Sequence, residues 1–264
     1  LEGVSECPDF FPLTDESGTE RWVFWGAKGV YVVGAFDGEE FVPETSDLIC
    51  EHGPNGYAAQ TWSDAPDGRL IQISWMAGGL YPEMPFNQQM SIPVELKLAG
   101  SGSEVKLTRW PVAELDALRR RAIRLEREVV TRERPLVVDT EAKLLDVSFT
   151  VRQQNAGKLY VMVRGQAIEF DWSANAFRFR ASAMHKVMAD RGGDVPLPDE
   201  PILSIRLLID KTSLEVFLNE GLVSASFCFL PNAYIHPLTL QCYEGEQIIE
   251  HLELHELESV WHGY

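Results

Sequence analysis

The sequence is divided into short stretches that alternate apolar and polar residues and end at Gly, Asp, Asn or Pro about every ten residues. In the N-terminal part these stretches are ERWVFWG (20–26), GVYVVGAFDG (29–38), YAAQTWSD (57–64) and RLIQISWMA (69–77). Runs of this length and spacing are typical of antiparallel all-β architectures. The Asp37-Gly38 dipeptide between two such runs is a strong signal for a hairpin turn. We therefore expect the N-terminal part to consist of short antiparallel strands.

From about Lys143 onward the alternation returns in longer runs, and a second β-rich region is expected there. At least seven or eight strands with turns between them favour a β-sandwich. One hairpin is expected in LLIDKTSLEVFLNEG (207–221), where Asp210 and Glu215 flank KTSL. Both carboxylates are expected to be solvated and to have no special role.

The stretch between these two regions differs in composition. AGSGSE (99–104) is expected to be a loop, and PVAELDALRRRAIRLERE (111–128) is expected to be a helix. Pro111 is placed for a first helical turn, and an apolar stripe follows at helical spacing. The expected organisation is therefore a β-rich unit (1–98), a loop and helical linker (99–130) and a β-sandwich (131–264).

The charge of the chain limits its partners. There are 23 basic and 40 acidic residues, which gives a formal net charge of −17. A surface of this sign repels phosphate backbones, so neither nucleic acid nor an anionic membrane is an expected partner. The basic run RRRAIRLER (119–127) contains Glu126, and we interpret it as a solvated helix face. No apolar run approaches the ~18 residues of a membrane span.

The four cysteines show no CxxC spacing, and we expect buried free thiols, which fits a reducing compartment. No signal peptide is seen, so a cytoplasmic location is expected, although the chain begins at Leu1 and upstream sequence stays open. His251 and His255 are spaced to share a strand face, as metal ligands do. Because no third ligand lies nearby, we interpret them as surface residues and expect no metal. Dinucleotide and P-loop motifs are absent, and no cofactor is expected.

The segment ECPDFF (6–11) is the first candidate for chemistry. A carboxylic acid such as Glu6, held in a partly dry pocket beside Cys7 and Pro8, suits general-acid work. A single glutamate is more often a surface residue, so the surrounding pattern has to support this interpretation.

ECPDFF resembles the acid/base motif of glycoside hydrolase family 32, the β-fructofuranosidases, which include invertases, levanases and inulinases. Further segments resemble the family in the same order. These are AFDGEEFVPE (35–44), GYAAQTWSD (56–64), RLIQISWMAGG (69–79), YPEMPFNQQMSIPVELKL (81–98) and LLIDKTSLEVFLNEG (207–221). The resemblance covers essentially the whole chain.

This resemblance implies an all-β fold in which a five-bladed β-propeller is joined by a helical linker to a C-terminal β-sandwich, with about two blades in this chain. It also implies retaining hydrolysis of β-fructofuranosides, such as sucrose or fructans, by two carboxylates ~5 Å apart. By its place in the motif, Glu6 matches the general acid/base. Trp75 matches a pocket tryptophan that packs on the sugar, Tyr57 a hydrogen-bond partner of the acid/base, and Cys7 a pocket-floor residue. Simple packing also explains these three, and Asp9 is expected to hold a turn.

The sequence departs from the family in one important respect. The family's nucleophile lies in an Asn-Asp-Pro-Asn-Gly motif and its fructose-binding Asp in Arg-Asp-Pro, and this chain has neither. The nearest lookalike, HGPNG (52–56), has Gly53 where the carboxylate would be, and we interpret it as a loop turn. Loss of a nucleophile typically costs several orders of magnitude in rate.

Two hypotheses follow. In the first, the chain is part of a β-fructofuranosidase, and an N-terminal chain supplies the missing blades and aspartates. In the second, it is a non-catalytic carbohydrate-binding or oligomeric assembly protein. Exposed blade edges favour pairing, so self-association is expected when the chain is alone. A plain all-β structural protein is a third and weaker explanation, because it makes the ordered series of segments a coincidence.

Overall fold

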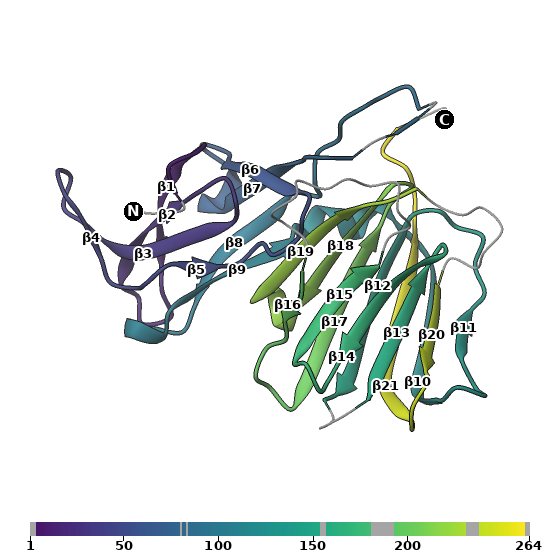
Figure 1. Ribbon diagram of the computed structural model, residues 1–264. Coiled ribbons are helices and arrows are strands. Elements are labelled where there is room, and N and C mark those ends of the chain that lie inside the picture. The colour runs from purple at the N-terminus through teal and green to yellow at the C-terminus, as the bar shows by residue number, and fades with distance from the viewer. Residues whose placement is uncertain are drawn as a thin grey trace.

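The computed structural model describes residues 4–79, 81–82, 84–153, 157–180, 193–230 and 238–261. These residues form four sheets, two in the N-terminal part and two in the C-terminal part, and every strand pairing within the sheets is antiparallel (Figure 1). The helical elements in the described ranges are short 3-10 turns: η1 (Pro66–Gly68), η2 (Gly102–Glu104), η3 (Ala113–Leu118) and η4 (Asn219–Gly221). The expected all-β class is confirmed.

The N-terminal part consists of two twisted sheets. The first has the order β1-β2-β3-β4, with β5 pairing to β3, and contains β1 (Asp9–Thr14), β2 (Glu20–Trp25), β3 (Val30–Phe36), β4 (Phe41–Pro43) and β5 (Leu48–Ile49). The second has the order β6-β7-β8-β9 and contains β6 (Gly56–Thr61), β7 (Leu70–Met76), β8 (Val94–Ala99) and β9 (Lys106–Pro111). Their first strands, β1 and β6, lie next to one another. This arrangement matches two adjacent propeller blades whose inner strands line the axis.

The turn between β3 and β4 shows how the sequence determines local structure. Gly38 has φ = 102°, which a residue with a Cβ rarely adopts. The Asp37 Oδ1 atom accepts hydrogen bonds from the backbone N–H groups of Glu39 (2.9 Å) and Glu40 (2.8 Å). The hairpin expected from Asp37-Gly38 is therefore confirmed.

Alternation along the strands separates two faces of the first sheet. Phe11, Val23 and Val33 are buried in a core shared with the second sheet. The opposite face is aromatic and only half-buried, with ring centroids 4.6–6.0 Å apart. We call it the aromatic face, and it consists of Phe10, Trp22, Phe24, Phe36 and Phe41.

The C-terminal part is a sandwich of two six-stranded sheets (Figure 1). One sheet has, in order, β10 (Arg119–Val130), β21 (Gln247–Leu257), β12 (Leu145–Arg152), β17 (Ile202–Ile209), β18 (Ser213–Leu218) and β19 (Val223–Cys228). The other has β11 (Leu136–Val138), β20 (Leu238–Cys242), β13 (Lys158–Val163), β14 (Gln166–Asp171), β15 (Ala176–Arg180) and β16 (Val195–Pro196). Aliphatic and aromatic side chains from the inner faces of both sheets form one continuous core.

The expected helix over residues 111–128 is wrong. Only η3 is helical, and Arg119–Val130 is a long strand that pairs with β21. Ile123 and Leu125 alternate with charged residues, so they can pack on the sandwich core from a strand. Pairing with β21 and this burial outweigh the helix propensity of an Arg- and Glu-rich run. Together with β9, β10 fills much of the segment expected to be a loop and helical linker.

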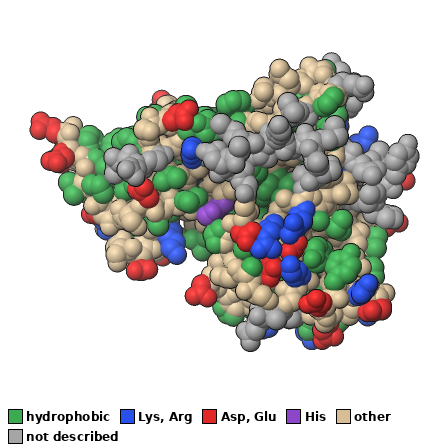
Figure 2. Space-filling model, viewed as in Figure 1, with side chains coloured by type: hydrophobic (Ala, Val, Ile, Leu, Met, Phe, Trp, Pro, Cys, Tyr) green, Lys and Arg blue, Asp and Glu red, His purple; other side chains and the backbone are tan. Residues whose placement is uncertain are grey.

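The basic run lies on the solvent side of β10. Four of its arginines pair with glutamates of the neighbouring strand β21 or of the residue directly after it. The pairs are Arg120–Glu258, Arg121–Glu256, Arg124–Glu253 and Arg127–Glu250. The run is thus a solvated face, as expected, but the face of a strand. Basic and acidic side chains are also mixed on the side of the sandwich seen in Figure 2.

Candidate active site

Glu6 lies in the segment that leads into β1. Its carbonyl oxygen accepts a hydrogen bond from the backbone N–H of Ala27 (2.9 Å), which fixes the segment to the turn after β2. Its carboxylate accepts a hydrogen bond from the Tyr57 hydroxyl. The side chain is exposed, so the residues that the structure describes do not enclose Glu6 in the partly dry pocket that suits a general acid.

Tyr57 and Trp75 lie opposite each other on β6 and β7. Their ring centroids are 6.0 Å apart with an interplanar angle of 74°. Tyr57 is buried, whereas 38% of Trp75 is exposed. The fold therefore brings Glu6, Tyr57 and Trp75 together, with an acid at one end and an open indole at the other.

Cys7 and Asp9 lie beside this group. Cys7 is exposed, and its carbonyl oxygen accepts a hydrogen bond from the Gln60 amide (3.1 Å). Asp9 accepts hydrogen bonds from the backbone N–H groups of Phe10 (3.0 Å) and Thr61 (2.7 Å), so it joins β1 to β6. The role of Cys7 at the sugar site stays a prediction. The expectation of buried free thiols is confirmed for Cys50, Cys228 and Cys242 and is wrong for Cys7, which is free but exposed.

The segment 88–92, which we call the strap, lies against the end of β7. The Trp75 indole N–H donates a hydrogen bond to the Gln88 side-chain oxygen (2.5 Å). Backbone hydrogen bonds join Met76 N to Gln89 O (3.0 Å) and Ser91 N to Ser74 O (2.9 Å). The strap thus runs beside the end of β7, where Met90 and Trp75 form an isolated antiparallel bridge, and it supports the exposed tryptophan.

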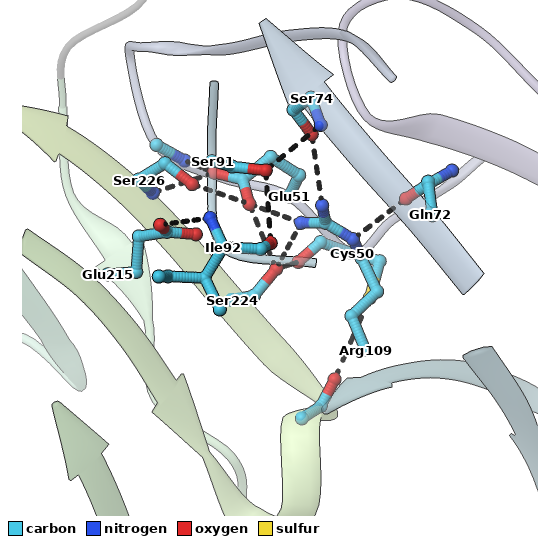
Figure 3. A network of polar contacts seen from close by, with 12 residues as sticks. Cys50, Glu51, Gln72, Ser74, Ser91, Ile92, Arg109, Glu215, Ser224 and Ser226 are labelled. Atoms are coloured by element: carbon cyan, nitrogen blue, oxygen red, sulfur yellow. Dashed lines mark hydrogen bonds and ion pairs between the residues drawn. The ribbon is translucent and has the colours of Figure 1, made fainter. Parts of the chain in front are cut away.

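On its other side the strap is attached to the sandwich hairpin β17–β18. The Thr212 hydroxyl donates to the Gln89 side-chain oxygen (2.8 Å). The backbone N–H of Ile92 donates to a carboxyl oxygen of Glu215 (2.7 Å), which Figure 3 shows. Glu215 is only 3% exposed, and burial raises its pKa from the ordinary 4.5 to about 8. The expectation that Glu215 is solvated is therefore wrong, whereas Asp210 is exposed as expected.

A buried ion pair of the N-terminal part lies next to Glu215 and is hydrogen-bonded to Ser224 and Ser226 of the sandwich (Figure 3). Arg109 of β9 pairs with Glu51 and donates to Ser224 (2.8 Å), and it also reaches Gln72 (3.0 Å) and Ser74 (3.1 Å) of β7. Burial alone would raise the pKa of Glu51. The charge of Arg109 and hydrogen bonds from backbone N–H groups outweigh burial and hold the pKa of Glu51 below its usual value.

The lookalike segment HGPNG (52–56) lies in the same junction. A Cβ atom at Gly53 would be 2.1 Å from the backbone nitrogen of Ser226, so this close approach requires glycine. The Asn55 side chain donates to the carbonyl of Ala77 (2.6 Å) and accepts from the N–H of Cys228 (2.8 Å). The segment is therefore a buried connector, and Gly53 does not replace a catalytic residue.

The described residues contain no group of three or more His, Cys, Asp or Glu side chains arranged to hold a metal ion. His251 and His255 instead contact Glu126 and Glu253, at 3.0 Å each. A surface hollow of about 320 Å³ lies away from Glu6, Tyr57 and Trp75. Its lining is Glu16, Glu95, Lys97, Leu98, Ala99, Thr108, Trp110 and Glu220.

Sequence reasoning did not identify Gln88, Thr212, Glu215 or the Glu51–Arg109 pair as parts of the site. Thr212 and Glu215 lie in a segment that resembles the family, but a resemblance in the sandwich does not show which side chains turn toward the other domain. The one signal available in the sequence was a glutamate between two apolar residues, Leu214 and Val216. In the structure, all residues of this strand are buried. Burial on both faces of a strand is a property of the folded molecule.

Two propeller-like sheets joined to a β-sandwich define a two-part all-β protein, with a carboxylate and an open indole near the inner strands of the sheets. Residues 1–111 match the glycosyl hydrolases family 32 N-terminal domain, and residues 114–256 match the glycosyl hydrolases family 32 C-terminal domain. The chain belongs to glycosyl hydrolase family 32.

Similar proteins of known name agree with this assignment. A levanase of Bacillus subtilis is 28% identical over 98% of this chain and 43% of its own length. A sucrose-6-phosphate hydrolase of Zymomonas mobilis is 26% identical over 86% of this chain and 48% of its own length. The crystal structure of exo-inulinase from Aspergillus awamori has the same fold, with a TM-score of 0.82, 19% identity and coverage of 97% of this chain and 57% of that one. The chain thus spans about half the length of these relatives.

Within the described ranges, no helix has both the length and the apolar character needed to cross a bilayer.

Proposed function

We propose that this chain forms the acid/base side of a site that hydrolyses β-fructofuranosides such as sucrose or fructans. Glu6 is the general acid/base, which protonates the leaving oxygen and then activates water. The observation that carries the proposal is the Tyr57 hydroxyl bound to the Glu6 carboxylate, with the half-exposed Trp75 ring beside it. A hydroxyl that donates to a carboxylate can hold it in one orientation toward a leaving group.

Trp75 and Tyr57 supply the sugar contact in this proposal. An indole face packs well against the apolar face of a sugar ring, and 38% exposure leaves part of Trp75 open for that contact. Cys7, next to Glu6, completes this side of the pocket.

The retaining mechanism also needs a nucleophilic carboxylate ~5 Å from the acid. We propose that residues outside this chain supply it, because the sequence lacks both aspartate motifs. An N-terminal chain that packs on the first sheet is one source. The half-buried aromatic face of that sheet supports such packing, because apolar rings gain free energy when a further layer covers them.

A second candidate function is carbohydrate binding without catalysis, in an assembly formed by self-association. It is favoured by the exposed Glu6, which lacks the dry surroundings that an acid catalyst needs. We also propose a cytoplasmic location, supported by the three buried cysteines that remain free thiols.

The test is hydrolysis of sucrose and a short fructan by the purified chain, with Glu6→Gln as the matched control. We expect the chain to fold, as shown by circular dichroism, and to release no fructose above buffer. Activity that is abolished in Glu6→Gln would show that the chain holds a nucleophile of its own and would contradict the proposed incompleteness.

The second half of the test adds a chain with the Asn-Asp-Pro-Asn-Gly and Arg-Asp-Pro motifs. Hydrolysis that appears only in the mixture, and only with Glu6 intact, supports the enzyme proposal. Sugar binding without hydrolysis in the mixture supports the binding alternative.

A further inference from the structure

The contacts between the sandwich and the strap concern the sugar site directly. Trp75 contacts Gln88, and the strap that carries Gln88 is attached to the sandwich by Thr212 and Glu215. These two attachments lie at opposite ends of the strap, so they fix its position and its direction.

We propose that Thr212 and Glu215 are positioning residues, through which the sandwich sets the orientation of Trp75 in the sugar site. The inference rests on the proposed function of Trp75 as a sugar contact. Neither residue touches the sugar, and both act through the strap.

Burial makes the loss of any of these hydrogen bonds costly. Thr212 is 4% exposed, Glu215 3% and Ser91 5%, so water cannot easily replace a lost partner. The Ser91 hydroxyl accepts from Ser74 N (2.9 Å) and donates to Ile92 O (3.1 Å), so β7 is attached to the strap directly before the residue that binds Glu215. A shift of the strap therefore displaces Gln88, whose side chain accepts the hydrogen bond of the indole.

The Trp75 indole N–H is the readout, because Gln88 accepts its hydrogen bond. The chain has seven tryptophans, and Trp75→Phe identifies the Trp75 signal in a nitrogen–proton spectrum of the indole groups. Trp172, 6% exposed and packed in the sandwich core, is the internal reference for an intact fold. The measured quantity is the exchange rate of each indole proton with water in the sugar-free protein.

We expect Thr212→Val and Glu215→Leu each to accelerate exchange at Trp75 at least about fivefold, the ratio that corresponds to one lost hydrogen bond. Trp172 should keep its rate. Thr212→Ser keeps the hydroxyl, and Glu215→Gln keeps an acceptor for Ile92 N–H, so both should restore the wild-type rate. Lys211→Ala, an exposed change in the same turn, is the control for a general effect on the hairpin.

Unchanged exchange at Trp75 in Thr212→Val and Glu215→Leu, with Trp172 intact, would overturn the proposal. So would equal acceleration in Lys211→Ala. If Thr212→Val does not fold, Gln89→Leu removes the same hydrogen bond from the strap side.

A second measurement separates this inference from the proposed function. Titration with fructose should shift the Trp75 signal, with at least about fivefold weaker binding in the two disruptive variants. If wild-type protein shows no shift, the sugar-site proposal fails, while the exchange rates still decide whether the sandwich positions Trp75.

Discussion

The Glu215 carboxyl group lies in the junction between the strap and the sandwich, where few charged groups are tolerated. Its surroundings include the Ile92 N–H group, the Glu51 carboxylate, the Arg109 guanidinium and Asp210. Burial disfavours its charged form most strongly, and the nearby Glu51 adds to this. Between pH 4.5 and about 8, the raised pKa of Glu215 therefore means that the folded protein holds a proton that the unfolded chain releases.

The sign of the resulting pH dependence follows from this difference. With a pKa of about 8 in the folded state and the ordinary 4.5 in the unfolded state, Glu215 contributes stability that is complete below pH 4.5. This contribution is lost as the pH rises toward 8. Glu215→Gln mimics the neutral acid, so the variant should be more stable than wild type above pH 8 by about 1–3 kcal/mol.

Urea unfolding of wild type and Glu215→Gln at several pH values from 5 to 9 measures this. The difference between the two proteins isolates Glu215 from other titrating groups, such as the half-buried His52, whose pKa is lowered by desolvation. A stability difference that stays constant over this range would contradict the assignment.

A separate prediction at the residue scale concerns the contribution of the Glu51–Arg109 pair to stability. Removing one partner of a buried pair leaves the other charge uncompensated, at a cost of about 3–5 kcal/mol. We expect Arg109→Met to lower the free energy of unfolding by this amount, because Glu51 then lacks its counter-charge at 3% exposure.

The matched control is Arg124→Met on the outer face of β10, where Arg124 pairs with Glu253 at the surface. This change should stay within about 1 kcal/mol. Equal losses in the two variants, measured by urea unfolding, would argue against the buried pair as a special contributor.

At the scale of elements, two kinds of contact stabilise the long strand β10. It pairs with β21, and it places Ile123 and Leu125 on the sandwich core. Its outward arginines then lie opposite the glutamates of β21, where opposite charges in neighbouring strands stabilise the pairing modestly.

Strand geometry predicts that substitutions at two neighbouring positions of β10 change the stability by different amounts. Leu125→Ala removes a half-buried side chain from the core and should cost about 1–3 kcal/mol. Arg124→Ala, one residue away and facing solvent, should change stability by less than about 1 kcal/mol. Chemical denaturation of the two variants gives the comparison, and similar losses at both positions would be inconsistent with a strand whose faces alternate.

At the scale of the whole molecule, the aromatic face of the first sheet is only half-buried and can be covered by a further β layer. Half-buried rings gathered on one face of a sheet favour association with another β structure.

We therefore expect the isolated chain to self-associate as its concentration rises, as measured by sedimentation velocity. Replacing Trp22 and Phe41 together by Ser should shift the protein toward the monomer, because both rings belong to the aromatic face. Val137→Ser, at a 44% exposed apolar position on the sandwich, is the control. A wild-type chain that stays monomeric would leave the aromatic face without a role in assembly.

The sequence was sufficient for much of the fold. The alternation of apolar residues and turn signals such as Asp37-Gly38 indicated antiparallel strands, because these features depend on residues close together in the chain. The order of segments that resemble glycoside hydrolase family 32 also brought Glu6, Tyr57 and Trp75 into one hypothesis, and the structure places the three together.

Other features depended on contacts between distant residues, and the tertiary structure alone decided them. Whether residues 119–130 form a helix or a strand is decided by β21, which lies more than a hundred residues further along the chain. Glu215 is buried because the strap covers it, across a separation of 123 residues. Local patterns report the propensity and the period of a segment, whereas burial, register and the partners of a charge arise only when the chain is folded.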